Sequence, residues 1–164
     1  LQEPKAVPTL MGLVESRGTS SDLRGYAAIA LGMIRPEGGL ERMIKILEED
    51  PDKVDLFRRA LCLGIGLYRQ PKAAAALGRV IGSDSRDIVR EHASLGLNLC
   101  RGRSEIEPLI KTHEKEKRGD VALFSVVALS GLGDRFEYPL VSEPFFNFNY
   151  RVRNPFVEEL QMLL

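Results

Sequence analysis

The chain has 164 residues, of which 44% are hydrophobic, and this proportion excludes an intrinsically disordered protein. Its 23 basic residues balance its 23 acidic ones, so no overall field draws the molecule to nucleic acid or to an anionic membrane. The longest apolar stretches, such as Val121–Leu129, fall short of the roughly 20 residues that a membrane span needs, and a soluble chain is expected.

A twelve-residue pattern recurs four times along the chain. The copies are LRGYAAIALGMI at Leu23–Ile34, FRRALCLGIGLY at Phe57–Tyr68, VREHASLGLNLC at Val89–Cys100 and VALFSVVALSGL at Val121–Leu132. Successive copies begin 34, 32 and 32 residues apart. A period of this length is typical of a stacked helical solenoid. The apolar residues within each copy follow helical spacing, so each copy is predicted to be the first helix of a repeat unit.

A short turn and a second helix are predicted after each copy, at about residues 40–49, 72–81, 106–117 and 138–143. Pro108 and Pro139 open two of these helices, where the missing N–H of proline is tolerated, and Pro8 marks the same kind of helix near the start. A single domain over residues 1–164 is therefore expected. It begins with an unpaired second helix at about 3–16, continues with units at about 22–50, 54–83, 87–118 and 120–146, and ends with an unpaired first helix at about 150–164.

Two positions of the first helices, counted as slots one to twelve of each copy, hold small residues. Slot eight holds Ala30, Gly64, Gly96 and Ala128, and slot ten holds Gly32, Gly66, Asn98 and Ser130. Glycine costs up to about 1 kcal/mol relative to alanine inside a helix. Its recurrence predicts that a neighbouring helix comes close enough to exclude a side chain.

Slot two holds arginine in most units: Arg24, Arg58, Arg90 and Arg153, with Ala122 breaking the series. Asp22, Asp55 and Asp87 lie close by, and Asp22 and Asp87 stand where helix N-caps belong. We interpret these arginines as structural residues that bond turn carbonyls or pair with an Asp near the helix start.

The two cysteines, Cys62 and Cys100, are predicted to be buried thiols rather than a disulfide. Repeat geometry places them on the order of 13 Å apart, from a helix rise of about 1.5 Å per residue and a helix spacing of about 10 Å. A disulfide needs Cα atoms within about 7 Å. Thiols of this kind slightly favour the cytoplasm, although the chain begins at Leu1 and an exported form with a removed leader stays open.

The repeats resemble a known family. A branched residue, then Arg, two small residues and Ala-Leu-Gly or a similar triplet are clearest at Leu23–Gly32 and Val121–Asp134. This pattern is similar to the short HEAT-like repeats of the phycobilisome-lyase type, over essentially the whole chain. The expected fold is all-α, a right-handed α-solenoid of stacked antiparallel helix pairs with about ten helices. The resemblance implies a general-purpose binding scaffold of a kind found in many bacterial proteins.

Local charge gives one set of candidate partner-binding residues. Residues 53–103 carry a net charge of +6, and the segments on either side carry −3 each. A basic ridge is predicted at the turns, from Arg69, Lys72, Arg101 and Arg103, although cations also collect near helix C-termini for structural reasons. Second helices line the concave side of similar stacks, which adds Arg42, Lys45, Arg79 and Lys111.

Aromatic residues give the other candidate set: Phe145, Phe146, Phe148 and Tyr150. They either fill a gap beneath the last helix or form an anchor patch for a partner.

The chain lacks the residues that most enzymes on such a scaffold require. Two histidines cannot supply a di-iron site spread over several units, and no nucleophile–base pair, zinc spacing or phosphate loop is present. No catalytic residue, metal or cofactor is expected. The sequence predicts a non-catalytic scaffold that binds another protein, with nucleic acid an unlikely partner. The alternatives are an anion or nucleic-acid binder through the basic middle repeats, and a phycobilin-lyase-like enzyme.

Overall fold

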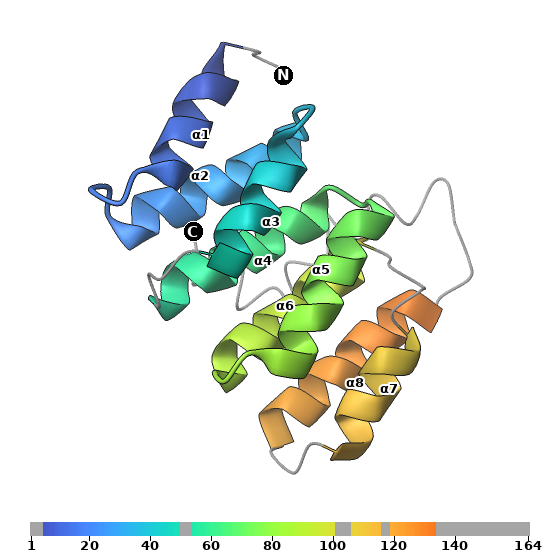
Figure 1. Ribbon diagram of the computed structural model, residues 1–164. Helices are drawn as coiled ribbons and strands as arrows, with labels where there is room; N and C mark the ends of the chain where they lie inside the picture. The colour runs from blue at the N-terminus through green and yellow to red at the C-terminus, as the bar shows by residue number, and fades with distance from the viewer. Residues whose placement is uncertain (1–4, 50–53, 101–105, 116–118, 134–164) are drawn as a thin grey trace, which may run out of the picture. The chain divides into compact units, whose positions relative to one another are not determined.

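A computed structural model of the chain describes residues 5–49, 54–100, 106–115 and 119–133, all within the first of two compact units, Leu1–Gly133 and Asp134–Leu164. The described ranges contain eight α-helices (Figure 1): α1 (Ala6–Glu15), α2 (Ser21–Ile34), α3 (Gly39–Glu49), α4 (Asp55–Leu67), α5 (Pro71–Ser83), α6 (Asp87–Cys100), α7 (Ile106–Lys115) and α8 (Gly119–Gly133). The helices predicted at 138–143 and 150–164 lie outside the described residues.

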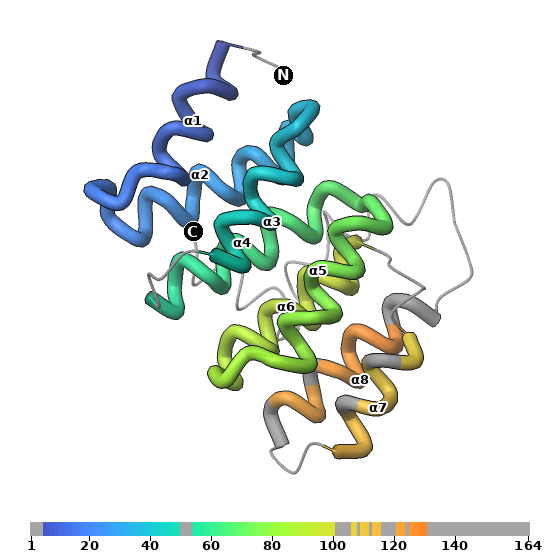
Figure 2. The backbone as a smooth tube through the Cα atoms, in the orientation of Figure 1, coloured from blue at the N-terminus to red at the C-terminus, as the bar shows by residue number. Residues whose placement is uncertain are grey.

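The helices form two layers. The first helices α2, α4, α6 and α8 contact one another in that order, and the second helices α3, α5 and α7 follow one another in the other layer (Figure 2). Each second helix packs more closely against the first helix that follows it than against the one before it, as in the pairs α1–α2 and α5–α6. The predicted all-α solenoid is confirmed over these residues.

The core lies between the two layers. Phe57, Leu61 and Ile65 of α4 are fully buried, as are Met43 of α3 and Leu77 of α5. The three residues of α4 are four positions apart, so they lie on one side of the helix and form an apolar stripe that faces inward. Burial of this continuous stripe is what holds neighbouring units together.

Glycines bring the first helices into backbone contact, as slots eight and ten predict. A Cβ atom on Gly32 would overlap the backbone of Gly64, and a Cβ atom on Gly66 would overlap the backbone of Gly96. Slot ten of one helix therefore meets slot eight of the next. Asn98 takes slot ten in α6, and slot eight of α8 is correspondingly Ala128 rather than glycine.

The slot-two arginines tie each second helix to the first helix that follows it. Arg24 Nε donates to the Val14 carbonyl of α1 at 3.0 Å, and Arg58 Nη1 donates to the Leu47 carbonyl of α3 at 2.7 Å. Arg90 Nε donates in the same way to the Ile81 carbonyl of α5 at 2.9 Å. All three acceptors lie in the last turn of their helix, where carbonyls have no partner within the helix. This confirms the structural interpretation for these three arginines, and Arg153 lies outside the described residues.

The fourth unit, where Ala122 replaces the arginine, is tied in the opposite direction. His113 of α7 lies with Nδ1 3.3 Å from the Ala122 carbonyl of α8 and 3.3 Å from Ser125 Oγ. The second helix here supplies the side chain, and the first helix supplies the backbone acceptor. The pair α7–α8 therefore keeps a polar connection without the arginine.

The prediction that Asp22 and Asp87 are N-caps is wrong. Ser20 caps α2, and its side chain accepts a hydrogen bond from the Leu23 N–H at 3.4 Å. Asp22 and Asp87 lie inside the first turns of α2 and α6. An acidic side chain in the first turn of a helix interacts favourably with the helix dipole, which explains the acidic residues at these helix starts.

Both cysteines are buried as thiols, and burial raises the pKa of Cys62 to about 12. We expect Cys62 to resist dithionitrobenzoate in the native protein at pH 8, because only the thiolate reacts and the side chain is fully buried. Both thiols should react once urea unfolds the chain. Rapid labelling of Cys62 in the native state, mapped by peptide mass spectrometry, would contradict this packing.

Candidate partner-binding surface

The exposed sides of α1, α3 and α5 form a surface that we name the second-helix face. Three ion pairs cross it between neighbouring helices. Arg42 of α3 pairs with Glu15 of α1 at 2.6 Å, while Lys72 and Arg79 of α5 pair with Glu41 and Glu48 of α3 at 2.9 and 2.6 Å. The side chains in these pairs are 40–60% exposed. The face therefore has its charges in fixed positions and still open to solvent.

The ion pairs leave the second-helix face without a net charge. The helices α1, α3 and α5 together carry four acidic and four basic residues. Hydrogen bonding from Lys72 lowers the pKa of Glu41, so that carboxylate stays ionised at neutral pH. Phosphate backbones require an excess of cations. This face consequently suits a polar protein surface better than a nucleic acid.

The other cations predicted to bind a partner are paired within one helix, lie in a turn or lie outside the described residues. Lys45 and Lys111 pair within their own helices, with Glu49 at 3.9 Å and Glu107 at 3.1 Å. Arg69 is exposed in the turn between α4 and α5. Arg101, Arg103 and the aromatic residues Phe145, Phe146, Phe148 and Tyr150 lie outside the described residues.

Several cations of the basic middle segment serve the fold. Arg58 Nη2 binds the Asp84 carboxylate at 2.8 Å, and Arg86 binds the same carboxylate at 3.1 Å and Asp55 at 3.1 Å. Arg90 pairs with Asp87 at 3.6 Å. The Arg58 and Asp84 side chains are only 12% and 6% exposed. These ion pairs join residues of the same segment and leave its net charge of +6 unchanged, but they show that Arg58, Arg86 and Arg90 serve the fold.

Two turn arginines occupy an unusual backbone conformation. Arg35 and Arg69 follow α2 and α4, and their φ angles of 55° and 54° place them in the left-handed region. This conformation costs an ordinary residue about 1–2 kcal/mol, and helices usually place glycine there. The next two units have Arg101 and Gly133 at the same position of the sequence repeat. Arginine is therefore present at a position where the backbone itself favours glycine.

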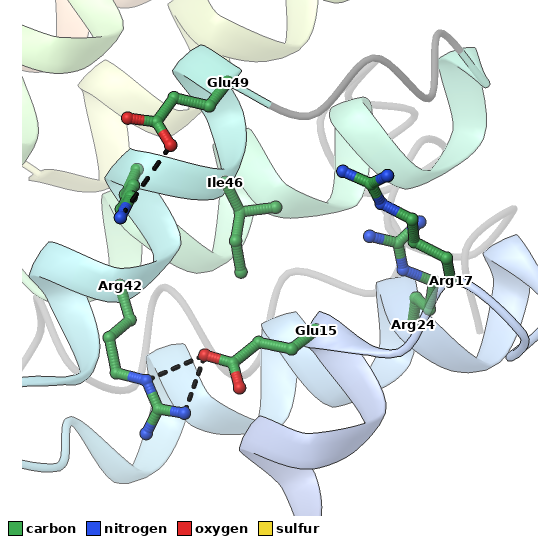
Figure 3. Close-up of a pocket in the computed structure, with 7 residues that line it drawn as sticks. Glu15, Arg17, Arg24, Arg42, Ile46 and Glu49 are labelled. Atoms are coloured by element: carbon green, nitrogen blue, oxygen red, sulfur yellow. Dashed lines mark hydrogen bonds and ion pairs between the residues drawn. The ribbon is translucent and has the colours of Figure 1, made fainter.

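A hollow of about 450 Å³ lies where α1 ends and α3 runs past it (Figure 3). Arg42 binds Glu15 at this hollow, and Arg17 and Arg24 also line it. Arg24 is buried, with its guanidinium carbon 3.8 Å from the centre of the Phe57 ring. The lining is formed by Glu15, Arg17, Arg24, Arg42, Lys45, Ile46 and Glu49.

The histidines and cysteines do not build a metal centre in the described ranges. No group of three or more His, Cys, Asp or Glu residues there is arranged to hold a metal ion. His92 is buried, and its Nε2 accepts a hydrogen bond from Arg59 Nε at 3.1 Å. Its Nδ1 must then carry the proton that is donated to the Ile88 carbonyl at 2.7 Å. His92 therefore connects α6 to α4 as part of the packing.

The sequence reasoning identified the cations of the second-helix face but missed their acidic partners. Glu41 and Lys72 are 31 residues apart, as are Glu48 and Arg79. This separation is close to the repeat period. Opposite charges one period apart on successive second helices therefore could have predicted these ion pairs from the sequence. Among the described helices, none is long and apolar enough to cross a membrane.

Comparison with known proteins agrees with this architecture. A family model described as HEAT repeats matches residues 16–98. A search of curated proteins gives no match. The matched segment covers α2 to α5 and most of α6, the part of the chain in which the glycine contacts and arginine ties repeat. The chain therefore belongs to the HEAT repeat family.

Proposed function

We propose that this protein is a non-catalytic scaffold that binds a protein partner along the second-helix face. The observation that carries the proposal is the set of three inter-helix ion pairs, Glu15–Arg42, Glu41–Lys72 and Glu48–Arg79. HEAT repeats are generally protein-interaction scaffolds, which supports the same class of function. The resemblance to phycobilisome-lyase repeats stays a prediction.

The ion pairs are better suited to recognition than to stability. An exposed pair contributes about 0–1 kcal/mol to folding. It nevertheless holds two long side chains in one geometry, so a partner meets a pattern of charge that is already ordered. A complementary polar surface gains specificity from such a pattern, because a misplaced like charge is costly.

Charge-swapped variants test the proposal. One variant combines Glu41→Lys and Lys72→Glu with Glu48→Arg and Arg79→Glu. It keeps both ion pairs and the net charge, but each acidic position of these pairs becomes basic and each basic position becomes acidic. We expect the swapped protein to unfold at the same urea concentration as the wild type within error. In affinity capture from the source organism, it should lose the partners that the wild type recovers.

A matched control uses an exposed ion pair on α7, the next second helix, outside the three helices that define the second-helix face. Swapping Lys111 with Glu107 of α7 reverses an exposed pair of the same kind within a single helix. That variant should recover the wild-type set of partners. Equal recovery by the swapped second-helix face would overturn the proposal.

A second candidate surface is the turn edge that contains Arg35 and Arg69, which would bind an anionic partner. The observation that favours it is the left-handed conformation, where the chain accepts strain to keep an arginine. We expect Arg35→Gly with Arg69→Gly to raise the free energy of unfolding by about 1 kcal/mol or more, because glycine relieves the strain.

The same double variant should elute from heparin at lower salt than the wild type. Lys45→Gln with Lys111→Gln is the control, because it removes two exposed cations from helices instead of turns. Elution of the turn variant and the control at the same salt concentration would show that the turn edge is not a specific anion site. Lower stability of the turn variant would show that the arginines are structural.

A further inference from the structure

The outer side of α2 carries exposed apolar residues at slots one, four and eleven of the repeat. Leu23, Tyr26 and Met33 are 47%, 42% and 71% exposed. These slots and slot eight, which is Ala30, are three or four residues apart and so form one stripe along the helix. The stripe lies apart from the second-helix face and has no role in the proposed function.

In the following first helices, the same stripe is the contact with the preceding first helix. Ala60 and Gly64 of α4 lie against Gly25 and Ala28 of α2, and Gly96 of α6 lies against Cys62 of α4. His92 at slot four of α6 bonds to Arg59 of α4. At slots one, four and eleven of α4 and α6, five of the six residues have exposures of 7% or less: Phe57, Ala60, Val89, His92 and Leu99. The sixth, Leu67 at slot eleven of α4, is partly exposed.

The stripe on α2 therefore continues an interface between successive first helices that recurs from α2 to α4, from α4 to α6 and from α6 to α8. The partner side of that interface is also defined, because slots six and ten of the opposite helix must be small for the backbones to meet. In α2 these slots are Ala28 and Gly32, and both face α4. A helix with that pattern, running parallel to α2, matches the stripe in shape and in apolar character.

We propose that the outer side of α2 is a docking surface for a first helix of a further HEAT-like repeat, one with small residues at slots six and ten. Ala30 at slot eight leaves slightly less room than the glycines of α4 and α6, as Ala128 does in α8. The docked helix is expected to carry a small residue at slot ten, as α2 and α4 do with Gly32 and Gly66.

A helix grafted onto the chain tests this surface. A copy of residues 20–35, with leucine in place of its own methionine, is fused ahead of Leu1 so that residues 1–5 connect it to α1. The readout is the rate at which peroxide oxidises the native Met33, measured by peptide mass spectrometry. We expect oxidation to slow several-fold and the urea midpoint of unfolding to rise, because Met33 becomes buried.

The control fusion carries Ala28→Leu and Gly32→Leu in the copied helix only. Leucine keeps helix propensity high but prevents the close approach, so Met33 should be oxidised as fast as in the unfused chain. A synthetic peptide of residues 20–35 with the same methionine replacement, added in excess to the unfused chain, repeats the test without a fusion. Protection of Met33 by the small-slot helix alone supports the proposal.

Three results would overturn it. Equal protection by both fusions would show non-specific apolar contact, and no protection by fusion or peptide would show that α2 accepts no such helix. Protection of Met33 in the unfused chain that rises with protein concentration, together with a dimer in sedimentation velocity, would show that a second copy occupies the surface instead.

Discussion

Replacing Gly66 with alanine is expected to destabilise the protein by about 1–3 kcal/mol, and valine should cost more, because a Cβ atom there overlaps the backbone of Gly96. The helices α4 and α6 would have to separate along their whole contact. The same change in an unhindered helix stabilises by up to about 1 kcal/mol. The sign of the effect therefore reports the backbone contact directly. Urea unfolding followed by circular dichroism measures it.

Two other glycines supply the control. Gly12 of α1 and Gly82 of α5 also lie in helices, and a Cβ atom on either meets nothing within 4 Å. We expect Gly12→Ala and Gly82→Ala to be neutral or stabilising. Destabilisation at Gly12 and Gly82 equal to that at Gly66 would show that helix contact is not the cause.

Replacing Asp84 with alanine is expected to cost about 3 kcal/mol or more, because it leaves the cations of Arg58 and Arg86 without their shared buried carboxylate. Asp84 lies at the end of α5 and binds Arg58 of α4 and Arg86 just before α6, so it fastens three successive helices. Glu48→Ala is the control, since its pair with Arg79 is exposed and should contribute less than about 1 kcal/mol. Equal losses in the two variants would contradict the buried network.

The Asp84 network also predicts a dependence on pH. Burial raises the pKa of Asp84, but hydrogen bonds from Arg86 and Arg58 more than offset this, so its pKa lies below the usual value. As pH falls, the unfolded chain binds the proton first, near its ordinary pKa of about 3.9. The stability from Asp84 is therefore complete above that pH and is lost as the pH falls through the lower folded value.

Asp84→Asn should weaken this dependence. The wild type is expected to lose stability more steeply than the variant below about pH 4, since only the wild type has this carboxylate to protonate. Urea titrations at several pH values measure the difference. Parallel losses in both proteins would show that other carboxylates account for the acid sensitivity.

The sequence was sufficient to predict the helical layers and the contacts between first helices. Both depend on residues that recur at fixed slots, such as Gly64 and Gly96, and a repeat shows the same physical requirement several times over. The arginine ties at Arg24, Arg58 and Arg90 were predictable for the same reason. Their acceptors were not, because any carbonyl at a helix end is chemically equivalent in the sequence.

The details that escaped prediction depend on single positions. The cap of α2 is Ser20 and not Asp22, because a shift of two residues decides which side chain reaches the Leu23 N–H. The ion pairs of the second-helix face were missed because Glu15, Glu41 and Glu48 come from a different repeat from their basic partners. Two of these pairs join residues 1–52 to residues 53–103, so a net charge summed over either segment hides them.

Hydrogen–deuterium exchange of the protein alone and with a captured partner tests the scaffold function most directly. Our account predicts that binding slows exchange in peptides from α3 and α5, which carry most of the ion pairs of the second-helix face. The turns at Arg35 and Arg69 and the outer side of α2 should exchange as before. Slowing confined to those turns or to α2, with α3 and α5 unchanged, would contradict the account.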